Sequence, residues 1–170
     1  ATIFGNPDLE PEMHVNLEFG TKANLKDRAS LQAAVLGVKL SQLDVWSAAR
    51  ESNANRYTER LAVAGLDRQI IVPAVAERCR SVWNQYTIRV PEGHRDTLRQ
   101  FLTERKVGTE IYYPVPLHLQ TMYADLEHGE GSLPVAEQVA KEVLSLPMYP
   151  ELNDEQILEV ATAIRRFYGS

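Results

Sequence analysis

Apolar residues recur at helical spacing in two stretches near the beginning of the chain. The first follows the i, i+3, i+4, i+7 pattern of one helix face at Leu31, Ala34, Val35 and Val38. The second predicts a helix over residues 43–64, with one stripe formed by Trp46, Ala49, Asn53, Tyr57 and Leu61. Gly65 follows this helix and suits the left-handed position beyond a helix end.

Three short runs in the middle of the chain predict β-strands: residues 70–72, 82–90 and 109–113. Pro73 and Pro114 end the first and third runs, because proline cannot donate to a β-ladder. A helical pattern over residues 94–106 separates the last two runs. Pro114 to Pro116 then predict an extended loop, since proline fixes its own φ and restricts the residue before it.

Two amphipathic helices complete the pattern. Pro134 suits a first helical turn. The apolar face of this helix is predicted to be Val135, Ala136, Val139, Ala140 and Val143. Glu137 and Lys141 are predicted to form an i, i+4 pair on its exposed side. Asn153 and Gln156 suit a capping box at the start of the last helix, whose stripe is Ile157, Val160, Ala161, Ile164 and Phe167.

Helices that separate and flank short strands indicate an α/β fold of the α+β kind, with a small, mostly antiparallel sheet packed with helices. The chain is expected to divide into an irregular segment over residues 1–27, long helices over residues 28–66 and a small α/β domain over residues 67–170. No internal repeat or low-complexity segment interrupts this order.

Composition narrows the class of protein. The 170 residues carry a formal net charge of -5 without a clustered basic face, which argues against a nucleic-acid partner. The sequence has no apolar run of about 18 residues and no leader-like start, so we expect neither a membrane span nor secretion. Cys79 is the single cysteine, and no Cys or His spacing suits zinc. These features are typical of the reducing cytoplasm.

The residues alone contain no complete catalytic signature: no phosphate-binding glycine loop, no nucleophile elbow and no metal-ligand set. Among the four histidines, His118 stands out because it follows a predicted strand and a loop stiffened by proline. Tyr112 and Tyr113 should point to opposite faces of that strand, so that one can face a cleft. A structural alternative stays open, in which a tyrosine packs against helices and His118 caps a turn.

Three motifs occur in order along the chain. They are LQAAVL with VKL (residues 31–36 and 38–40), VGTEIYYPVPLHLQ (residues 107–120), and PVAE followed by LSLPMYPEL (residues 134–137 and 144–152). Together they resemble the DegT-type family of sugar aminotransferases that depend on pyridoxal 5'-phosphate (PLP). The resemblance covers roughly residues 30 to 168.

The resemblance implies a mechanism and a missing part. In the family, a lysine of a large N-terminal domain holds PLP as a Schiff base, and an aspartate pairs with the pyridine nitrogen. An amino group, usually from glutamate, passes to a keto-sugar attached to a nucleotide. Both residues lie upstream of the matched motifs. None of the five lysines stands in the family's Schiff-base context: Lys22, Lys26, Lys39, Lys106 and Lys141.

We therefore expect the chain to be the C-terminal part of such an enzyme and to be inactive alone. Residues 1–27 would continue from the large PLP domain, and residues 28–66 would supply interface helices of a homodimer. Neither a catalytic residue nor a metal ligand is expected within this chain.

The resemblance also assigns binding residues. Asn24 matches an asparagine that reaches across the dimer to the partner's PLP phosphate, and Lys26 stands where the family usually has arginine. His118 matches a histidine close to the cofactor and substrate. Tyr113 matches a tyrosine of the family and is expected to hydrogen-bond the sugar or to line the pocket. Tyr112 stands where many members carry histidine, so it is expected to line the substrate site without moving a proton.

Two other classes of function stay open from the sequence. One is a non-catalytic binding or interaction module that keeps this fold, and the other is a regulator. The upstream reading frame distinguishes them: a continuous large domain with a lysine supports the enzyme, and a start codon directly before Ala1 supports the module.

Overall fold

The computed structural model describes residues 35–169. Residues 35–40 are helical and lead through a turn into the long helix α2 (Leu43–Val63). The other elements are β1 (Tyr86–Arg89), α3 (Arg95–Glu104), the 3-10 helices η1 (Leu117–Leu119) and η2 (Thr121–Leu126), α4 (Pro134–Glu142), β2 (Val143–Leu146) and α5 (Asp154–Tyr168).

The sheet is small and antiparallel, as predicted. β1 pairs with β2, with Ile88 opposite Leu144 in the register. A single bridge joins Ile71 to Arg89 on the outer side of β1, and another joins Glu110 to Ser145 on the outer side of β2. Four segments of chain therefore lie in antiparallel order, although only the central two are regular strands.

The predicted strands were too long. Residues 70–72 and 109–113 each reduce to one bridged residue, because Pro73 and Pro114 cannot donate to a ladder. The run over residues 82–90 becomes regular only at Tyr86, since Trp83 has a φ of 50°, which interrupts an extended chain. Local periodicity located the strands but not their ends.

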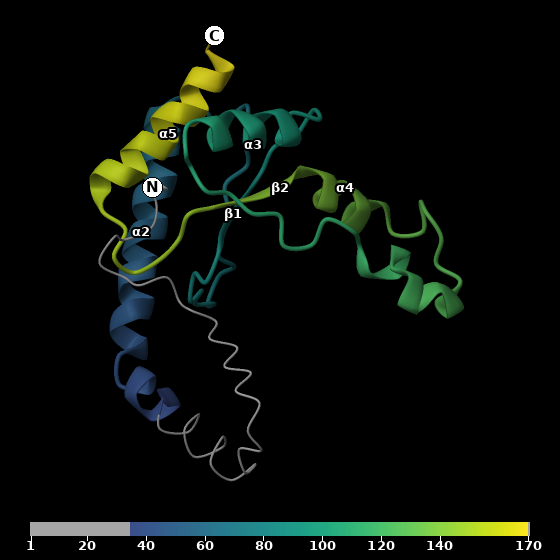
Figure 1. Ribbon diagram of the computed structural model, residues 1–170, viewed down its shortest axis with the longest axis horizontal. Coiled ribbons are helices and arrows are strands. Elements are labelled where there is room, and N and C mark those ends of the chain that lie inside the picture. Colours follow the sequence, from purple (N-terminus) through teal and green to yellow (C-terminus); the bar gives the residue numbers. More distant parts are fainter. Residues whose placement is uncertain (1–34, 170) are drawn as a thin grey trace, which may run out of the picture.

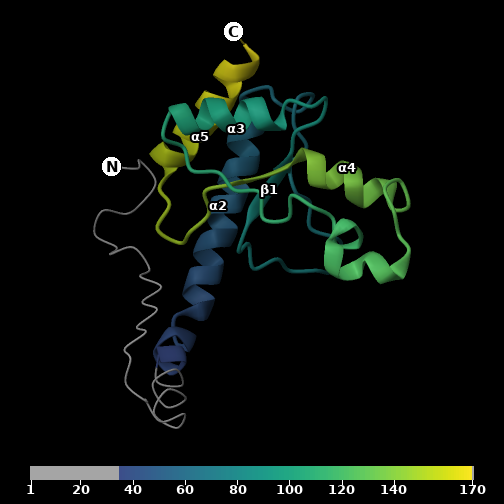
Figure 2. The same ribbon diagram turned by 45° about the vertical axis from the view of Figure 1, so that its right-hand side comes forward.

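Three helices pack together beside the sheet. Figures 1 and 2 show α5 lying along α2, with α3 next to α5. Ile88 and Leu144 of the strands are fully buried, as are Leu98 of α3 and Ile157 and Ile164 of α5. The Tyr57 ring of α2 stacks on the Tyr86 ring of β1 at 5.0 Å between centroids. The core thus joins the sheet to all three helices.

A buried amide secures α2 to the chain that precedes α5. Asn53 is fully buried, and its Nδ2 donates to the carbonyl oxygen of Tyr149 at 2.8 Å. A buried amide side chain is tolerated only when it is hydrogen-bonded. This contact explains why a polar residue belongs to the predicted stripe of α2, together with buried Tyr57 and Leu61.

The last helix matches its prediction. Asn153 accepts from the backbone N–H of Gln156 at 2.9 Å, and the Gln156 side chain accepts from the backbone N–H of Asn153 at 3.0 Å. This reciprocal capping box satisfies two N–H groups at the helix start. The predicted stripe faces the core, and at the end of α2, Gly65 has the left-handed φ of 73° that follows a helix end.

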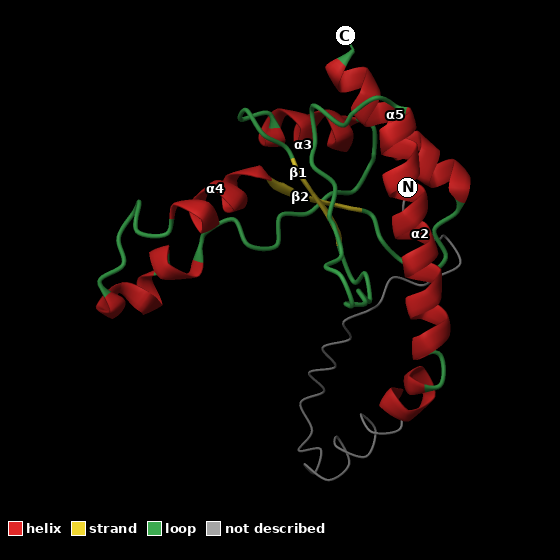
Figure 3. Cartoon of the chain, turned by 180° about the vertical axis from the view of Figure 1, so that it is seen from behind, coloured by secondary structure: helices red, strands yellow, loops and turns green. Residues whose placement is uncertain are grey.

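Two parts extend away from this body. Figures 1 and 3 show the start of α2 on one side, and η1, η2 and α4 on another, forming an arm over residues 117–142. The helical residues before and at the start of α2 expose apolar side chains: Val35, Leu36, Val38, Leu40, Leu43 and Val45. Within the described part of the chain, no helix is long and apolar enough to cross a membrane.

We predict that Ile157→Ala lowers the free energy of unfolding by about 2–5 kcal/mol, because it removes a fully buried side chain and leaves a cavity. The adjacent Leu158 is 47% exposed, so Leu158→Ala should change the free energy of unfolding by about 0.5 kcal/mol or less. Urea unfolding followed by circular dichroism measures both. Equal effects of the two substitutions would contradict the assigned core face of α5.

Candidate functional site

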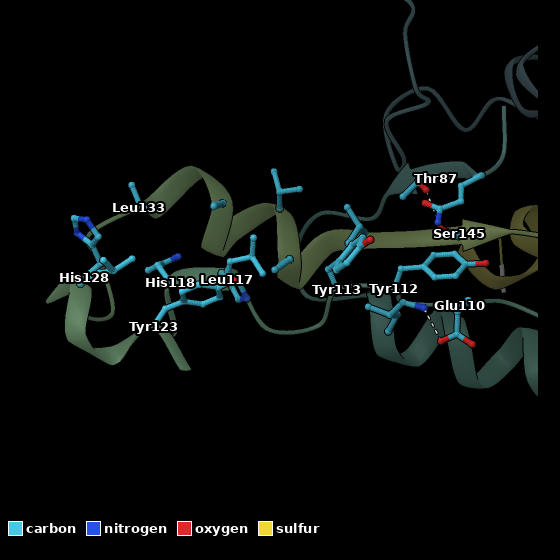
Figure 4. A pocket seen from close by; sticks show the side chains of 18 residues that line it. Thr87, Glu110, Tyr112, Tyr113, Leu117, His118, Tyr123, His128, Leu133 and Ser145 are labelled. Atoms are coloured by element: carbon cyan, nitrogen blue, oxygen red, sulfur yellow. Dashed lines mark hydrogen bonds between the residues drawn. The ribbon is translucent and has the colours of Figure 1, made fainter. Parts of the chain in front are cut away.

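A cavity of about 730 Å3 lies between the sheet, the loop that follows α3, and the arm. Its walls are mostly apolar, and α4 contributes Ala136, Val139 and Ala140 to them. Figure 4 shows two groups of polar side chains at its ends. Thr87, Glu110, Tyr112 and Ser145 gather at the sheet end, and His118, Tyr123 and His128 at the arm end, with Tyr113 between them.

The sheet end of the pocket is held by hydrogen bonds across the strands. Thr87 Oγ1 and Ser145 Oγ lie 2.8 Å apart, so one hydroxyl donates to the other. The backbone N–H of Ser145 donates to the carbonyl oxygen of Glu110 at 2.8 Å, and Glu110 N–H returns the bond at 3.1 Å. These contacts fix the loop after α3 against β2, immediately before the two tyrosines.

Both tyrosines of the VGTEIYYPVPLHLQ motif line this pocket. Tyr112 is 52% exposed and Tyr113 is 71% exposed. The expectation that they point to opposite faces, with one of them in the core, is wrong. The chain leaves the ladder after Glu110, so the alternation of a strand no longer applies to the next residues.

His118 is the buried histidine of the site. It lies in η1, is only 8% exposed, and its Nε2 is 3.0 Å from Oε1 of Glu137. The alternative in which this histidine caps a turn is therefore not what the structure contains, because its partner is a carboxylate on α4. Sequence reasoning selected His118 correctly as unusual but did not identify this partner.

Glu137 occupies the first turn of α4 and is 8% exposed. Both carboxylate oxygens accept from the backbone N–H of Gly131 at 2.9 Å, and Oε1 also accepts from Leu133 N–H at 3.3 Å. The Gly131 hydrogen bond, followed by that of His118, holds the pKa of Glu137 below its usual 4.5, although burial opposes this shift. The carboxylate is thus ionised and accepts every hydrogen bond.

The predicted surface pair between Glu137 and Lys141 is wrong. Lys141 is exposed, and no ion pair joins the two side chains in the described structure. The sequence did contain one indication that Glu137 acts at the start of the helix. It lies in the predicted first turn, where the helix dipole favours an acidic group. The apolar face of α4 was also misassigned: Val135 is 75% exposed, and Val143 begins β2.

Sequence reasoning missed several other residues of the pocket. Tyr123 and His128 come from the arm, and Thr87 and Ser145 come from the strands. Nothing in their local pattern distinguishes them from surface or strand residues. They meet only because the chain between β1 and β2 returns to the same sheet edge.

The described residues do not by themselves fit PLP. A covalent site needs a lysine amine, and the phosphate needs several donors or cations. The three lysines of residues 35–169 are Lys39, Lys106 and Lys141, and neither they nor any arginine line the pocket. Asn24 and Lys26 lie outside the described residues and stay predictions. No cluster suited to a metal occurs in the described part of the chain.

A small antiparallel sheet packed with helices, beside an open apolar pocket, defines a partial α/β domain. The sequence matches the DegT/DnrJ/EryC1/StrS aminotransferase family over residues 4–165, and the chain belongs to this family. This result confirms the family that the three motifs indicated.

Several relatives are similar in sequence. A protein of Geobacillus stearothermophilus named pleiotropic regulatory protein is 46% identical over 81% of this chain and 36% of its own length. The dTDP-3-amino-3,4,6-trideoxy-alpha-D-glucose transaminase of Streptomyces venezuelae is 37% identical over 98% of this chain and 45% of its own length. The chain thus spans less than half the length of these two curated relatives.

Solved structures show the same fold. The crystal structure of S. venezuelae DesV in complex with a ketimine intermediate matches with a TM-score of 0.75 and 42% identity, over 82% of this chain and 36% of DesV. A family aminotransferase from Brucella abortus matches with a TM-score of 0.69 and 38% identity, over 82% of this chain and 35% of its own. The described fold is therefore that of aminotransferases of this family.

We predict that the stabilising effect of the Glu137 charge depends on pH. The pKa of Glu137 in the folded protein is below the ordinary 4.5, so its contribution is present above pH 4.5 and is lost as the pH falls through the lowered folded value. Wild type should exceed Glu137→Gln in unfolding free energy at neutral pH, and the difference should shrink in acid.

Denaturant unfolding of both proteins at neutral and acidic pH measures this difference. Exposed Glu130, in the same loop, provides the control Glu130→Gln, which should show a much smaller effect. A difference between wild type and Glu137→Gln that does not change with pH would contradict the ionised carboxylate.

Proposed function

We propose that this chain is the C-terminal part of a PLP-dependent enzyme that transfers an amino group from glutamate to a keto-sugar carried on a nucleotide. Family membership supports the reaction class. The relatives include proteins named as transaminases of nucleotide-linked sugars, from S. venezuelae and Aneurinibacillus thermoaerophilus. We assign the binding of PLP to the rest of the enzyme, because the chain spans less than half the length of these relatives.

The observation that carries the proposal is the chemistry of the pocket lining. The described lining contains Glu110 as its one carboxylate and no lysine or arginine. A diphosphate would not be neutralised there, whereas an uncharged sugar ring can place its carbon faces on tyrosine rings and its hydroxyls on Thr87 or Ser145. We therefore assign the sugar to this pocket and the diphosphate to a position outside it.

Each site residue then has a proposed role. Tyr112 and Tyr113 contact the sugar at the open side of the pocket, and His118 lies on the wall nearest the reacting carbon. Asn24 and Lys26 provide an amide and a positive charge for the coenzyme phosphate of a second subunit. Lysine offers a point charge there, whereas arginine would offer a fork of donors.

The association of two chains belongs to the same proposal. Exposed apolar side chains gather over residues 35–45, and a patch of this kind is typical of a surface that contacts another protein. We propose that residues 28–66 pack in a homodimer, that residues 67–170 form the small domain, and that residues 1–27 lead from a large PLP domain. We also propose a cytoplasmic location, where nucleotide sugars are available.

A second candidate function is regulatory. It is supported by the name of the G. stearothermophilus relative and by that of the erythromycin biosynthesis sensory transduction protein EryC1 of Saccharopolyspora erythraea, which is 43% identical over 86% of this chain. The product of the complete reading frame distinguishes the two functions. With glutamate, an aminotransferase converts its PLP to the amine form, which an absorbance scan detects, and a regulator leaves the PLP spectrum unchanged.

We predict that the 170-residue chain alone forms no stable aldimine with PLP. Equimolar PLP should give no absorbance band that borohydride traps, and mass spectrometry should find no pyridoxyl group on any of the five lysines. Free lysine at the same concentration is the control for non-specific reaction. One lysine labelled stoichiometrically, above this control, would refute the proposed division of the active site.

We predict that Leu36→Asp weakens self-association. Leu36 is 65% exposed on the helical surface before α2, and a buried charge at an apolar interface is costly. Val135→Asp is the matched control, because Val135 is also 75% exposed but lies on α4, outside residues 28–66. Light scattering over a range of concentrations measures the mass. A monomeric wild type, or equal loss of association in both variants, contradicts the proposed interface.

A further inference from the structure

The buried contact between His118 and Glu137 fixes the positions of both side chains more firmly than a surface ion pair would. The His118 side chain is 6% exposed and the Glu137 side chain 10%, and the distance from Nε2 to Oε1 is 3.0 Å. The two residues come from different segments, η1 and the first turn of α4. A pair that is excluded from water and held on two elements has a fixed geometry, whereas an exposed pair does not.

The carboxylate determines the direction of the hydrogen bond. Gly131 N–H points at both oxygens of Glu137, and Leu133 N–H points at Oε1. Backbone N–H groups can only donate, so the carboxyl group accepts from two fixed donors before the histidine is considered. A group surrounded by donors in this way is an acceptor, and the hydrogen between Nε2 and Oε1 therefore belongs to the ring.

This direction has a consequence for the other ring nitrogen. A neutral imidazole carries one proton, and when Nε2 holds it, Nδ1 is the only nitrogen that can accept another. His118 is also one of the residues that line the pocket. A carboxylate that orients a histidine and fixes its tautomer is a recurring arrangement behind functional histidines.

We propose that Glu137 is a positioning residue for His118, which keeps the proton on Nε2, fixes the ring against the arm and leaves Nδ1 as the one proton-accepting nitrogen that His118 offers in the pocket. The catalytic meaning of this inference rests on the proposed aminotransferase function, but its geometry does not. The same carboxylate binds the loop of Gly131, so a purely structural role is the alternative that the experiment must exclude.

The geometry is tested by nitrogen-15 NMR of the 170-residue chain with labelled histidine, in alkaline solution where imidazole is neutral. His118→Phe assigns the His118 signal among the four histidines. We expect an Nε2–H signal protected from rapid exchange in the wild type. Glu137→Gln should keep it, because an amide oxygen still accepts, and the equally long Glu137→Met should lose it.

The wild-type spectrum decides the geometry even if Glu137→Met fails to fold. A proton on Nδ1, or an Nε2–H that exchanges as fast as in free histidine, overturns the proposal. An unchanged Nε2–H signal in a folded Glu137→Met protein also overturns it, because the carboxylate would then have no effect on the ring.

The catalytic part is tested in the product of the complete reading frame. We expect Glu137→Met and His118→Phe each to lower kcat by about 10- to 100-fold, with little change in KM; loss of a carboxylate that orients a metal-bound histidine has an effect of this size. The double variant should be no slower than the slower single variant, because both substitutions remove one unit. Glu137→Gln should restore part of kcat, and Glu130→Gln is the neutral control.

Additive losses in the double variant would show that Glu137 acts independently of His118, through the loop, and would overturn the positioning role. A Gln variant as slow as the Met variant would also overturn it, because an accepting oxygen at this position would then not support the reaction. If the wild-type protein does not transaminate, the proposed function fails, and the NMR result still decides the tautomer. The two failures are therefore distinguishable.

Discussion

The pocket depends on the junction at which α4 passes into β2 without an intervening loop. α4 ends at Glu142, and Val143 has the extended φ of -70° and ψ of 137°. The backbone carbonyl of Glu142 accepts from Val90 N–H at 2.8 Å. In the side chain of the same residue, Oε2 accepts from Arg89 Nη2 at 2.7 Å. Hydrogen bonds from Gln138 and Arg89 lower the pKa of Glu142. These contacts fix the direction in which α4 leaves the sheet. The pocket lies between α4 and the sheet.

The far end of that helix carries Glu137, which closes the arm onto His118 and the loop of Gly131. One rigid element thus connects the hydroxyls on the strands with the imidazole on the arm. The described residues offer rings, hydroxyls and one oriented histidine, but no amine at the pocket. This division suits a domain that shapes and closes an active centre while another part of the enzyme binds the coenzyme covalently, as we propose.

The sequence predicted what local forces determine. The capping box of Asn153 and Gln156 and the stripe of α5 depend on neighbours within four residues, so periodicity identified them. β2 was missed because Val143 continues the apolar spacing of α4, and only its pairing with Arg89 makes it a strand. His118 was identified by its proline-rich loop, but its partner Glu137 was not, since that contact requires the chain over residues 119–133 to fold back. Tyr112 and Tyr113 were selected correctly as pocket residues, with the wrong orientation.

We propose that this pocket faces the coenzyme at which the amino group is transferred. A crystal structure of the complete protein with PLP and a nucleotide sugar tests it most directly. We expect the coenzyme to be bonded to a lysine outside these 170 residues, with the sugar between Tyr113 and His118 and the diphosphate outside the pocket. A coenzyme remote from both residues, with the pocket filled by the protein's own side chains, would contradict it.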